Sequence, residues 1–284
     1  MLGTGKTNDH MISINIGGLD MKKMKRFLRA MLSVFAAAIL MGTIPACASR
    51  PSEKSGPKFV AHRGYSRNYV DNTEESFRAA AEMDFYGIET DIRKTKDGYF
   101  VCTHDAEVEY ANRTKAEISS TDRETLLSLP LKNNKTKQDV YLCTFETYLQ
   151  ACKAGGKVAV IELKDLFGKS DIRKILATVD QEYDRAHVSF ISFYYLSLLR
   201  VKEVDASIEL QYLSQTEADP VFESCLSDGI SIDVKQNILT EALVETFHEA
   251  GLKVNVWTVN ENADLRAACA LGVDYITTDV FSEN

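Results

Sequence analysis

The chain has 284 residues, of which 45% are hydrophobic and 26% charged, as in ordinary globular proteins. Six Lys or Arg and two Asp fall in the first 47 residues, so the rest holds 27 basic against 39 acidic side chains, a net charge of −12. Such a chain repels polyanions and shows no basic stripe, so we expect no nucleic-acid partner. Clustered carboxylates could instead hold a hard divalent cation.

Residues 1–49 look like an upstream extension followed by a targeting signal. A basic stretch at 21–29 precedes an uncharged run at 30–49, as in secretory signals. The run contains Ile44-Pro45-Ala46-Cys47, which resembles a bacterial lipobox, where the cysteine becomes the lipid-modified first residue. We therefore expect an extracytoplasmic lipoprotein attached to the membrane through Cys47. Plain secretion and an uncleaved anchor remain alternatives, since twenty uncharged residues can span a bilayer.

A polar linker is predicted at 50–57, and short apolar strands then alternate with amphipathic helices through 58–284. The eight predicted strands are Lys58–His62, Gly87–Asp91, Lys157–Leu163, His187–Phe193, Ser207–Leu213, Gly229–Val234, Lys253–Val259 and Val273–Thr278. The helices predicted between them are Thr73–Phe85, Asp171–Glu182, Tyr194–Val204, Asp219–Leu226, Thr240–Ala250 and Glu261–Leu271. This alternation predicts an α/β fold of the (β/α)8 TIM-barrel type. An open doubly wound sheet needs fewer strands and usually a glycine-rich nucleotide loop, which the sequence lacks.

One connection is longer than the others. Between the second and third predicted strands we expect a small insertion at about 99–152. It should carry the segment Tyr99–Asp105 and two short helices near Thr121–Leu129 and Thr144–Cys152.

Polar residues gather where the predicted strands end, which is the catalytic end of such barrels. Glu89 and Asp91 are two apart on one strand and so project from the same face, and Glu162 is the second-last residue of the next predicted barrel strand. Three inward carboxylates are costly to bury unpaired. A bound calcium or magnesium ion would resolve this, because these ions prefer oxygen ligands. A salt-bridge network is the alternative, with partners Arg63, Lys94 and Lys164.

The cysteines and histidines narrow the chemistry further. The sequence has no Cys-x-x-Cys pair, so a structural zinc site is not expected, and the five cysteines after Cys47 are interpreted as buried free thiols. Only two histidines, His62 and His104, fall at the predicted mouth of the barrel. Two histidines beside three carboxylates suggest an acid–base pair.

At these residues the chain resembles the glycerophosphodiester phosphodiesterase family over about residues 58–279. The motifs that carry the resemblance, in chain order, are His62-Arg63-Gly64, Asp71-Asn72-Thr73, Gly87-Ile88-Glu89-Thr90-Asp91, Thr95-Lys96-Asp97-Gly98, Val101-Cys102-Thr103-His104-Asp105, Glu162-Leu163-Lys164, Val256-Trp257-Thr258-Val259-Asn260, Gly272-Val273-Asp274 and Thr278-Asp279. Two positions depart from the family pattern: Asp71 stands where the family usually has Glu, and Val280 replaces a common proline.

The resemblance implies metal-dependent hydrolysis of a glycerophosphodiester to glycerol 3-phosphate and an alcohol. It assigns the metal to Glu89, Asp91 and Glu162, acid–base catalysis to His62 and His104, and the phosphate to Arg63 and Lys164. Asn72 and Trp257 are further candidates for contact with the substrate or with these residues. The insertion resembles the subdomain that covers the substrate's glycerol.

Two other functions remain open. A related barrel phospholipase, of the phosphatidylinositol phospholipase C or sphingomyelinase D kind, would act on intact lipid and need an apolar or aromatic rim. Candidate rim residues are Tyr65, Tyr69, Tyr110, Tyr194 and Tyr195. The third possibility is a non-catalytic lipoprotein that only binds a phosphodiester.

Overall fold

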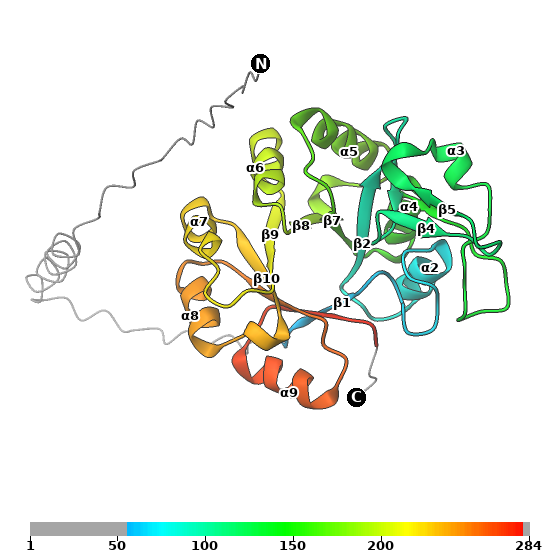
Figure 1. Ribbon diagram of the computed structural model, residues 1–284. Coiled ribbons are helices and arrows are strands. Elements are labelled where there is room, and N and C mark those ends of the chain that lie inside the picture. The colour runs from blue at the N-terminus through cyan, green and yellow to red at the C-terminus, as the bar shows by residue number, and fades with distance from the viewer. Residues whose placement is uncertain (1–55, 281–284) are drawn as a thin grey trace, which may run out of the picture. The chain divides into compact units, whose positions relative to one another are not determined.

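The computed structural model describes residues 56–280 (Figure 1). The signal-like segment with Cys47 and most of the linker predicted at 50–57 therefore lie outside the described residues. No helix within 56–280 is both long and apolar enough to cross a membrane.

Eight parallel strands close into a barrel, which confirms the predicted (β/α)8 fold. In spatial order the strands are β1 (Lys58–Ala61), β2 (Gly87–Lys94), β7 (Val158–Leu163), β8 (Val188–Ser192), β9 (Glu209–Ser214), β10 (Ser231–Lys235), β11 (Val254–Trp257) and β12 (Tyr275–Thr278). The barrel closes because β1 pairs with both β12 and β2. Each strand coincides with one predicted from the sequence.

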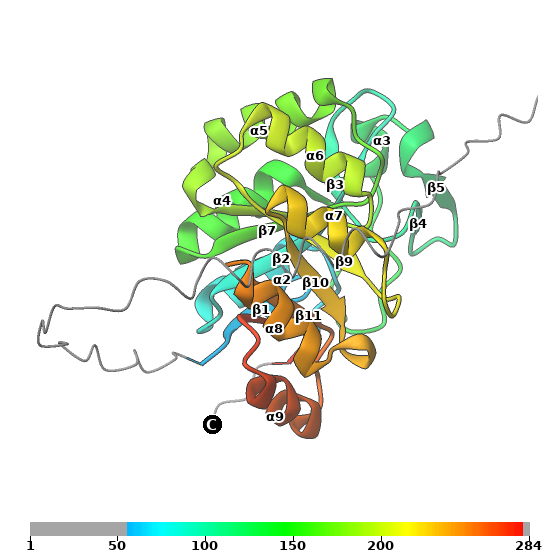
Figure 2. The same ribbon diagram turned by 90° about the vertical axis from the view of Figure 1, so that its left-hand side faces the viewer.

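Helices surround the barrel (Figure 1, Figure 2), and the ring has seven of them within residues 56–280. They are α2 (Glu74–Glu82), α4 (Phe145–Gly155), α5 (Lys169–Glu182), α6 (Tyr195–Val204), α7 (Val221–Asp228), α8 (Glu241–Glu249) and α9 (Asn262–Leu271). Helix α4 coincides with the second helix expected in the insertion, but it packs between α2 and α5. It therefore belongs to the barrel ring, and the segment outside the ring ends before it.

The inserted segment extends the end of β2 and has a small core of its own. It contains β3 (Phe100–Cys102), β4 (Glu107–Glu109), β5 (Lys115–Glu117), a 3-10 turn (Ile118–Ser120), α3 (Arg123–Leu126) and β6 (Cys143–Thr144). Strand β3 pairs antiparallel with the last residues of β2. The apolar residues of this core are Val101, Val108, Tyr110, Ile118, Leu126 and Leu142. This pairing fixes the segment beside the mouth of the barrel.

A layer of branched side chains fills the barrel beneath its mouth. It consists of Val60, Val160, Ile191 and Leu213, one each from β1, β7, β8 and β9. Because strand residues alternate in direction, Glu162 shares the inward face of Val160 and lies one step nearer the mouth. The larger core lies between strands and helices. Four cysteines are buried free thiols as expected, namely Cys102, Cys143, Cys152 and Cys225, but the expectation of burial is wrong for Cys269, which is exposed.

Candidate active site

A cavity of about 320 Å³ opens at the carboxyl ends of the barrel strands. Seven of the sequence-predicted site residues line it: His62, Arg63, Glu89, His104, Glu162, Lys164 and Trp257. Another cavity, of about 380 Å³, lies around the other ends of the strands, at Val158, Val188 and Ser207. None of the predicted catalytic or metal-binding residues lines that second cavity. The chemistry therefore belongs to the cavity at the mouth.

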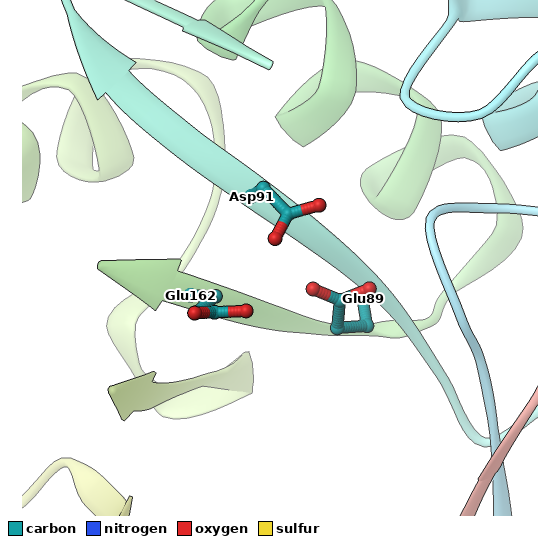
Figure 3. A group of neighbouring side chains, drawn as sticks. All are labelled: Glu89, Asp91 and Glu162. Atoms are coloured by element: carbon teal, nitrogen blue, oxygen red, sulfur yellow. The ribbon is translucent and has the colours of Figure 1, made fainter. Parts of the chain in front are cut away.

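The carboxylates of Glu89, Asp91 and Glu162 converge beside this cavity. Each offers an oxygen within 4.8 Å of the others, and Figure 3 shows the three groups facing a common space from two neighbouring strands. Their exposed fractions are only 2%, 1% and 8%. Buried carboxylates this close repel one another unless a cation or a proton lies among them.

Two basic side chains lie against the triad. The Nζ of Lys164 is 3.0 Å from Glu162 Oε1 and 3.5 Å from Asp91 Oδ1, and the Nε of Arg63 is 3.3 Å from Asp91 Oδ2. Burial alone would raise the pKa of Asp91, but the charges of Arg63 and Lys164 lower it. Burial and the neighbouring carboxylates raise the pKa of Glu89 well above its usual value, and burial with the charge of Asp91 raises the pKa of Glu162 to about 8.

These contacts leave the triad short of positive charge. The third partner of the salt-bridge alternative, Lys94, pairs with Asp171 at 2.8 Å instead. The Oδ1 of Asp91 is buried and has no hydrogen-bond partner within residues 56–280. Three carboxylates face two cations, and among the described residues Asp91 Oδ1 has only the ion pair with Lys164 at 3.5 Å. This arrangement fits a divalent cation better than a closed salt-bridge network.

A tight turn places Arg63 over the triad. Arg63 and Gly64 both adopt positive φ, 56° and 81°, and the Arg63 backbone N–H donates to Glu89 Oε2 at 2.8 Å. The turn packs on the start of α2, where the Ser76 hydroxyl donates to the Arg63 carbonyl. A Cβ on residue 64 would lie 2.5 Å from Ser76 Oγ, so only glycine fits there.

His62 is held by a carboxylate just after the last strand of the barrel. Its Nδ1 lies 2.7 Å from Asp279 Oδ1, and that carboxylate also accepts hydrogen bonds from Ser66 and Asn260. Burial alone would raise the pKa of Asp279, but the hydrogen bond and charge of His62 lower it well below its usual value. With Nδ1 occupied, Nε2 is the free ring nitrogen of His62.

His104 has a similar but more exposed partner. Its Nδ1 lies 2.7 Å from Asp105 Oδ1, and the side chains are 43% and 80% exposed. The loop that carries it is fixed by Arg93, whose guanidinium donates twice to the His104 carbonyl and pairs with Asp165 at 2.8 Å. The two histidines thus share one cavity, each with a carboxylate on Nδ1.

Comparisons with known proteins identify the family of the chain. Residues 62–283 match the glycerophosphoryl diester phosphodiesterase family. The chain belongs to this family. A relative from Caldanaerobacter subterraneus, a glycerophosphodiester phosphodiesterase, is 26% identical over 78% of this chain and 93% of its own length. A human relative, a lysophospholipase D, is 25% identical over 77% of this chain and 81% of its own.

Solved structures show the same fold. A glycerophosphodiester phosphodiesterase from Parabacteroides distasonis superposes with a TM-score of 0.67 at 26% identity, covering 80% of this chain and 94% of the other. A phosphodiesterase from Oleispira antarctica, in complex with the product sn-glycerol-3-phosphate, gives a TM-score of 0.72 at 22% identity over 79% and 93% of the two chains.

In this member of the glycerophosphoryl diester phosphodiesterase family, Asn72 supports the triad rather than lining the cavity. Its amide donates to Asp91 Oδ2 at 2.8 Å and accepts from Thr90 at 2.7 Å. Trp257 lines the cavity, and its Nε1 donates to the Asp233 carbonyl.

Sequence reasoning gave no role to three residues of the site: Asp279, Arg93 and Asp233. Alternation along β2 could have revealed Arg93, which lies two residues after Asp91 and four after Glu89. Asp279 falls within the quoted Thr278-Asp279 motif, but its contact with His62 spans 217 residues. Asp233 lies between Ile232 and Val234 in the short strand β10.

Proposed function

We propose that this protein hydrolyses glycerophosphodiesters to glycerol 3-phosphate and an alcohol with the help of one divalent cation. The observation that carries the proposal is a single cavity in which two histidine–aspartate pairs adjoin three convergent buried carboxylates. Membership of the family and the activity named for its relatives support it. A phosphodiester is an anion with a poor leaving group, so the site must neutralise charge, activate a nucleophile and protonate the leaving oxygen.

Charge neutralisation falls to the cation and two basic side chains. Glu89, Asp91 and Glu162 would hold calcium or magnesium through oxygen ligands. When bound, such an ion supplies Lewis-acid stabilisation of negative charge on phosphate. Arg63 and Lys164 line the same cavity and are fixed against the triad, so their charges are preorganised for the phosphate.

Proton transfer falls to His62 and His104. Each has its Nδ1 beside a carboxylate, which fixes the ring and leaves Nε2 for the reacting groups. One histidine takes the proton of the nucleophile, which is water or a glycerol hydroxyl of the substrate, and the other gives a proton to the leaving oxygen. This intact pair also favours an enzyme over a lipoprotein that only binds phosphodiesters.

The experiment compares His62→Ala and His104→Ala on two substrates, one with a poor alkoxide leaving group and one releasing nitrophenolate. Each change should lower kcat on the poor leaving group by at least about 100-fold, since one proton transfer contributes roughly 10²–10⁴. The variant whose turnover recovers on the substrate that releases nitrophenolate is the one that has lost the general acid. Near-normal turnover of the poor leaving group by either variant would overturn the acid–base assignment.

A second candidate substrate class is lysophospholipid. Leu166, Tyr194 and Leu196 are 54%, 47% and 47% exposed, in the segments that follow β7 and β8 at the mouth. Of the tyrosines considered for a rim, Tyr110 is instead buried in the insertion. The human relative's name, a lysophospholipase D, points the same way. The test compares kcat/KM for glycerophosphocholine and lysophosphatidylcholine in wild type and in the double variant Leu166→Ser, Leu196→Ser. It shows whether this surface contacts the acyl chain of a lysophospholipid.

We further propose that the protein is an extracytoplasmic lipoprotein anchored through Cys47. The proposal rests on the lipobox-like sequence that ends at Cys47 and on the uncharged run around it.

A further inference from the structure

The walls of the active-site cavity differ from one side of the barrel to the other. Strands β1, β2 and β7, with the inserted segment, supply the histidines, the carboxylates and both cations already described. The wall formed by β8 to β11 and the residues that follow them is mostly apolar, with Ile191, Phe193, Leu213, Gln215 and Trp257. This second wall has one ionisable group, Asp233 on β10. The reaction proposed above gives that carboxylate no role.

Asp233 is buried, and one of its carboxylate oxygens has no partner in the part of the chain that the structure describes. Its exposed fraction is 1%, and its Oδ1 has no hydrogen-bond partner within residues 56–280. No ion pair to Asp233 occurs in the same described range, whereas Asp91 has Arg63 and Lys164 nearby. An unpaired buried carboxylate is costly, and burial with the charge of Glu162 raises the pKa of Asp233 well above its usual value. A cationic group brought in by a ligand would remove that cost.

Two aromatic rings, Trp257 and Phe193, line the same wall of the cavity as this carboxylate. Trp257 Nε1 donates to the backbone carbonyl of Asp233 at 3.3 Å, which holds the indole against β10. Phe193 meets Trp257 edge to face, with ring centroids 5.9 Å apart. Carboxylate and aromatic faces together are the groups that recognise organic ammonium ions, by charge and by cation–π attraction.

We propose that Asp233, with Trp257 and Phe193, forms a subsite for an organic ammonium group on the alcohol half of the substrate, and so selects phosphodiesters of amino alcohols. The proposal rests on the proposed phosphodiesterase function for its substrate, and it makes Asp233 a specificity residue that takes no part in proton transfer. Aliphatic and aromatic neighbours suit an alkylated or primary ammonium better than a second metal ion, which would need several further oxygen ligands.

The kinetic test uses the cation-loaded protein and four diesters: glycerophosphocholine and glycerophosphoethanolamine, which are cationic in the head group, and glycerophosphoglycerol and glycerophosphoinositol, which are not. In Asp233→Asn, which keeps the shape and removes the charge, kcat/KM for the two cationic substrates should fall at least about tenfold. The neutral substrates should change less than about threefold. Asp84→Asn removes an exposed carboxylate just before β2, away from the cavity, and should leave all four unchanged.

Two kinetic outcomes would overturn the proposal. An equal loss on all four substrates would mean that Asp233 contacts the glycerol common to them. Unchanged values for all four would mean that it contacts no part of the substrate.

A binding test does not depend on turnover. Trp257 is the protein's single tryptophan, so its fluorescence reports on this subsite. Choline should bind wild type and bind Asp233→Asn at least about tenfold more weakly, whereas 3,3-dimethylbutan-1-ol, its neutral isostere, should not distinguish the two. Equal choline binding by the two proteins, or none by wild type, would contradict the subsite. If no diester is hydrolysed, the phosphodiesterase proposal fails, and the choline titration still decides on the cation subsite.

Discussion

The two histidine–aspartate pairs differ in how far water reaches them. Asp279 is 32% exposed beside His62, and Asp105 is 80% exposed beside His104. Exposed ion pairs have a small interaction energy because solvent screens their charges. Asp279 should therefore position its histidine more strongly than Asp105 does.

We expect Asp279→Asn to lower kcat by about 100-fold with little change in KM, because the change disturbs the ring orientation and proton position of His62. Asp105→Asn, the matched control, should lower kcat less than about tenfold. Steady-state kinetics with circular dichroism of both variants makes the comparison. A larger loss of kcat in Asp105→Asn than in Asp279→Asn, with both variants folded, would contradict the stronger positioning role of Asp279.

The triad predicts how stability depends on pH in the cation-free protein. Glu162 has a pKa of about 8 against 4.5 unperturbed, so between these values the folded state binds more protons than the unfolded state. Stability is therefore highest below about pH 4.5 for this group and falls as the pH rises towards 8. We expect the Tm of chelated protein to fall by about 2–8 °C from pH 5 to pH 8, which corresponds to a loss of about 1–2 kcal/mol in the free energy of unfolding.

The matched control is Glu162→Gln, which cannot titrate and should reduce this fall. Added calcium or magnesium should raise the Tm of wild type more at pH 8 than at pH 5, because the cation binds the ionised carboxylates. A Tm that rises from pH 5 to pH 8 in chelated wild type, and by the same amount in Glu162→Gln, would contradict the raised pKa.

At the scale of single elements, the turn after β1 connects backbone geometry to catalysis. Gly64→Ala would place a methyl group 2.5 Å from Ser76 Oγ at a φ of 81°. We expect the free energy of unfolding to fall by at least about 2 kcal/mol, from strain and overpacking together. Gly251→Ala has a similar φ of 72° but no heavy atom within 4 Å of the added Cβ, and should cost only about 1 kcal/mol. Equal losses in urea unfolding would show that the packing against α2 is unimportant.

Elements were predictable from the sequence where the signal is local. The eight strands followed from apolar, β-branched runs, and the triad followed from the two-residue spacing of Glu89 and Asp91 together with the end of β7. Helix α4 was recognised as a helix but placed in the insertion, because its packing between α2 and α5 is not visible in local periodicity.

Contacts across the barrel were not predictable in this way. Asp279 meets His62 only because β12 pairs with β1 and closes the barrel. Asp233 likewise has no ion-pair partner within residues 56–280, and this depends on which side chains the neighbouring strands place beside it. A sequence pattern shows which face a side chain takes but not which partners a closed barrel brings to it.

At the scale of the whole molecule, attachment to a membrane is a prediction from residues outside the described range. Cys47→Ser should leave the protein unlipidated, with a changed mass and in the soluble fraction. Fractionation and intact mass measurement of both proteins check this. A variant that stays membrane-bound with the mass of wild type would favour an uncleaved anchor over a lipoprotein.

The central claim is that a cation held by Glu89, Asp91 and Glu162 is required for the release of glycerol 3-phosphate. Phosphorus NMR of a glycerophosphodiester digest, with wild-type protein before chelation, after exhaustive chelation and after calcium or magnesium is restored, tests it most directly. We predict that glycerol 3-phosphate forms, that its formation stops on chelation and that it returns with the cation, while Glu162→Gln is at least about 100-fold slower throughout. Full turnover after exhaustive chelation, or a phosphorylated alcohol as the product in place of glycerol 3-phosphate, would contradict the account.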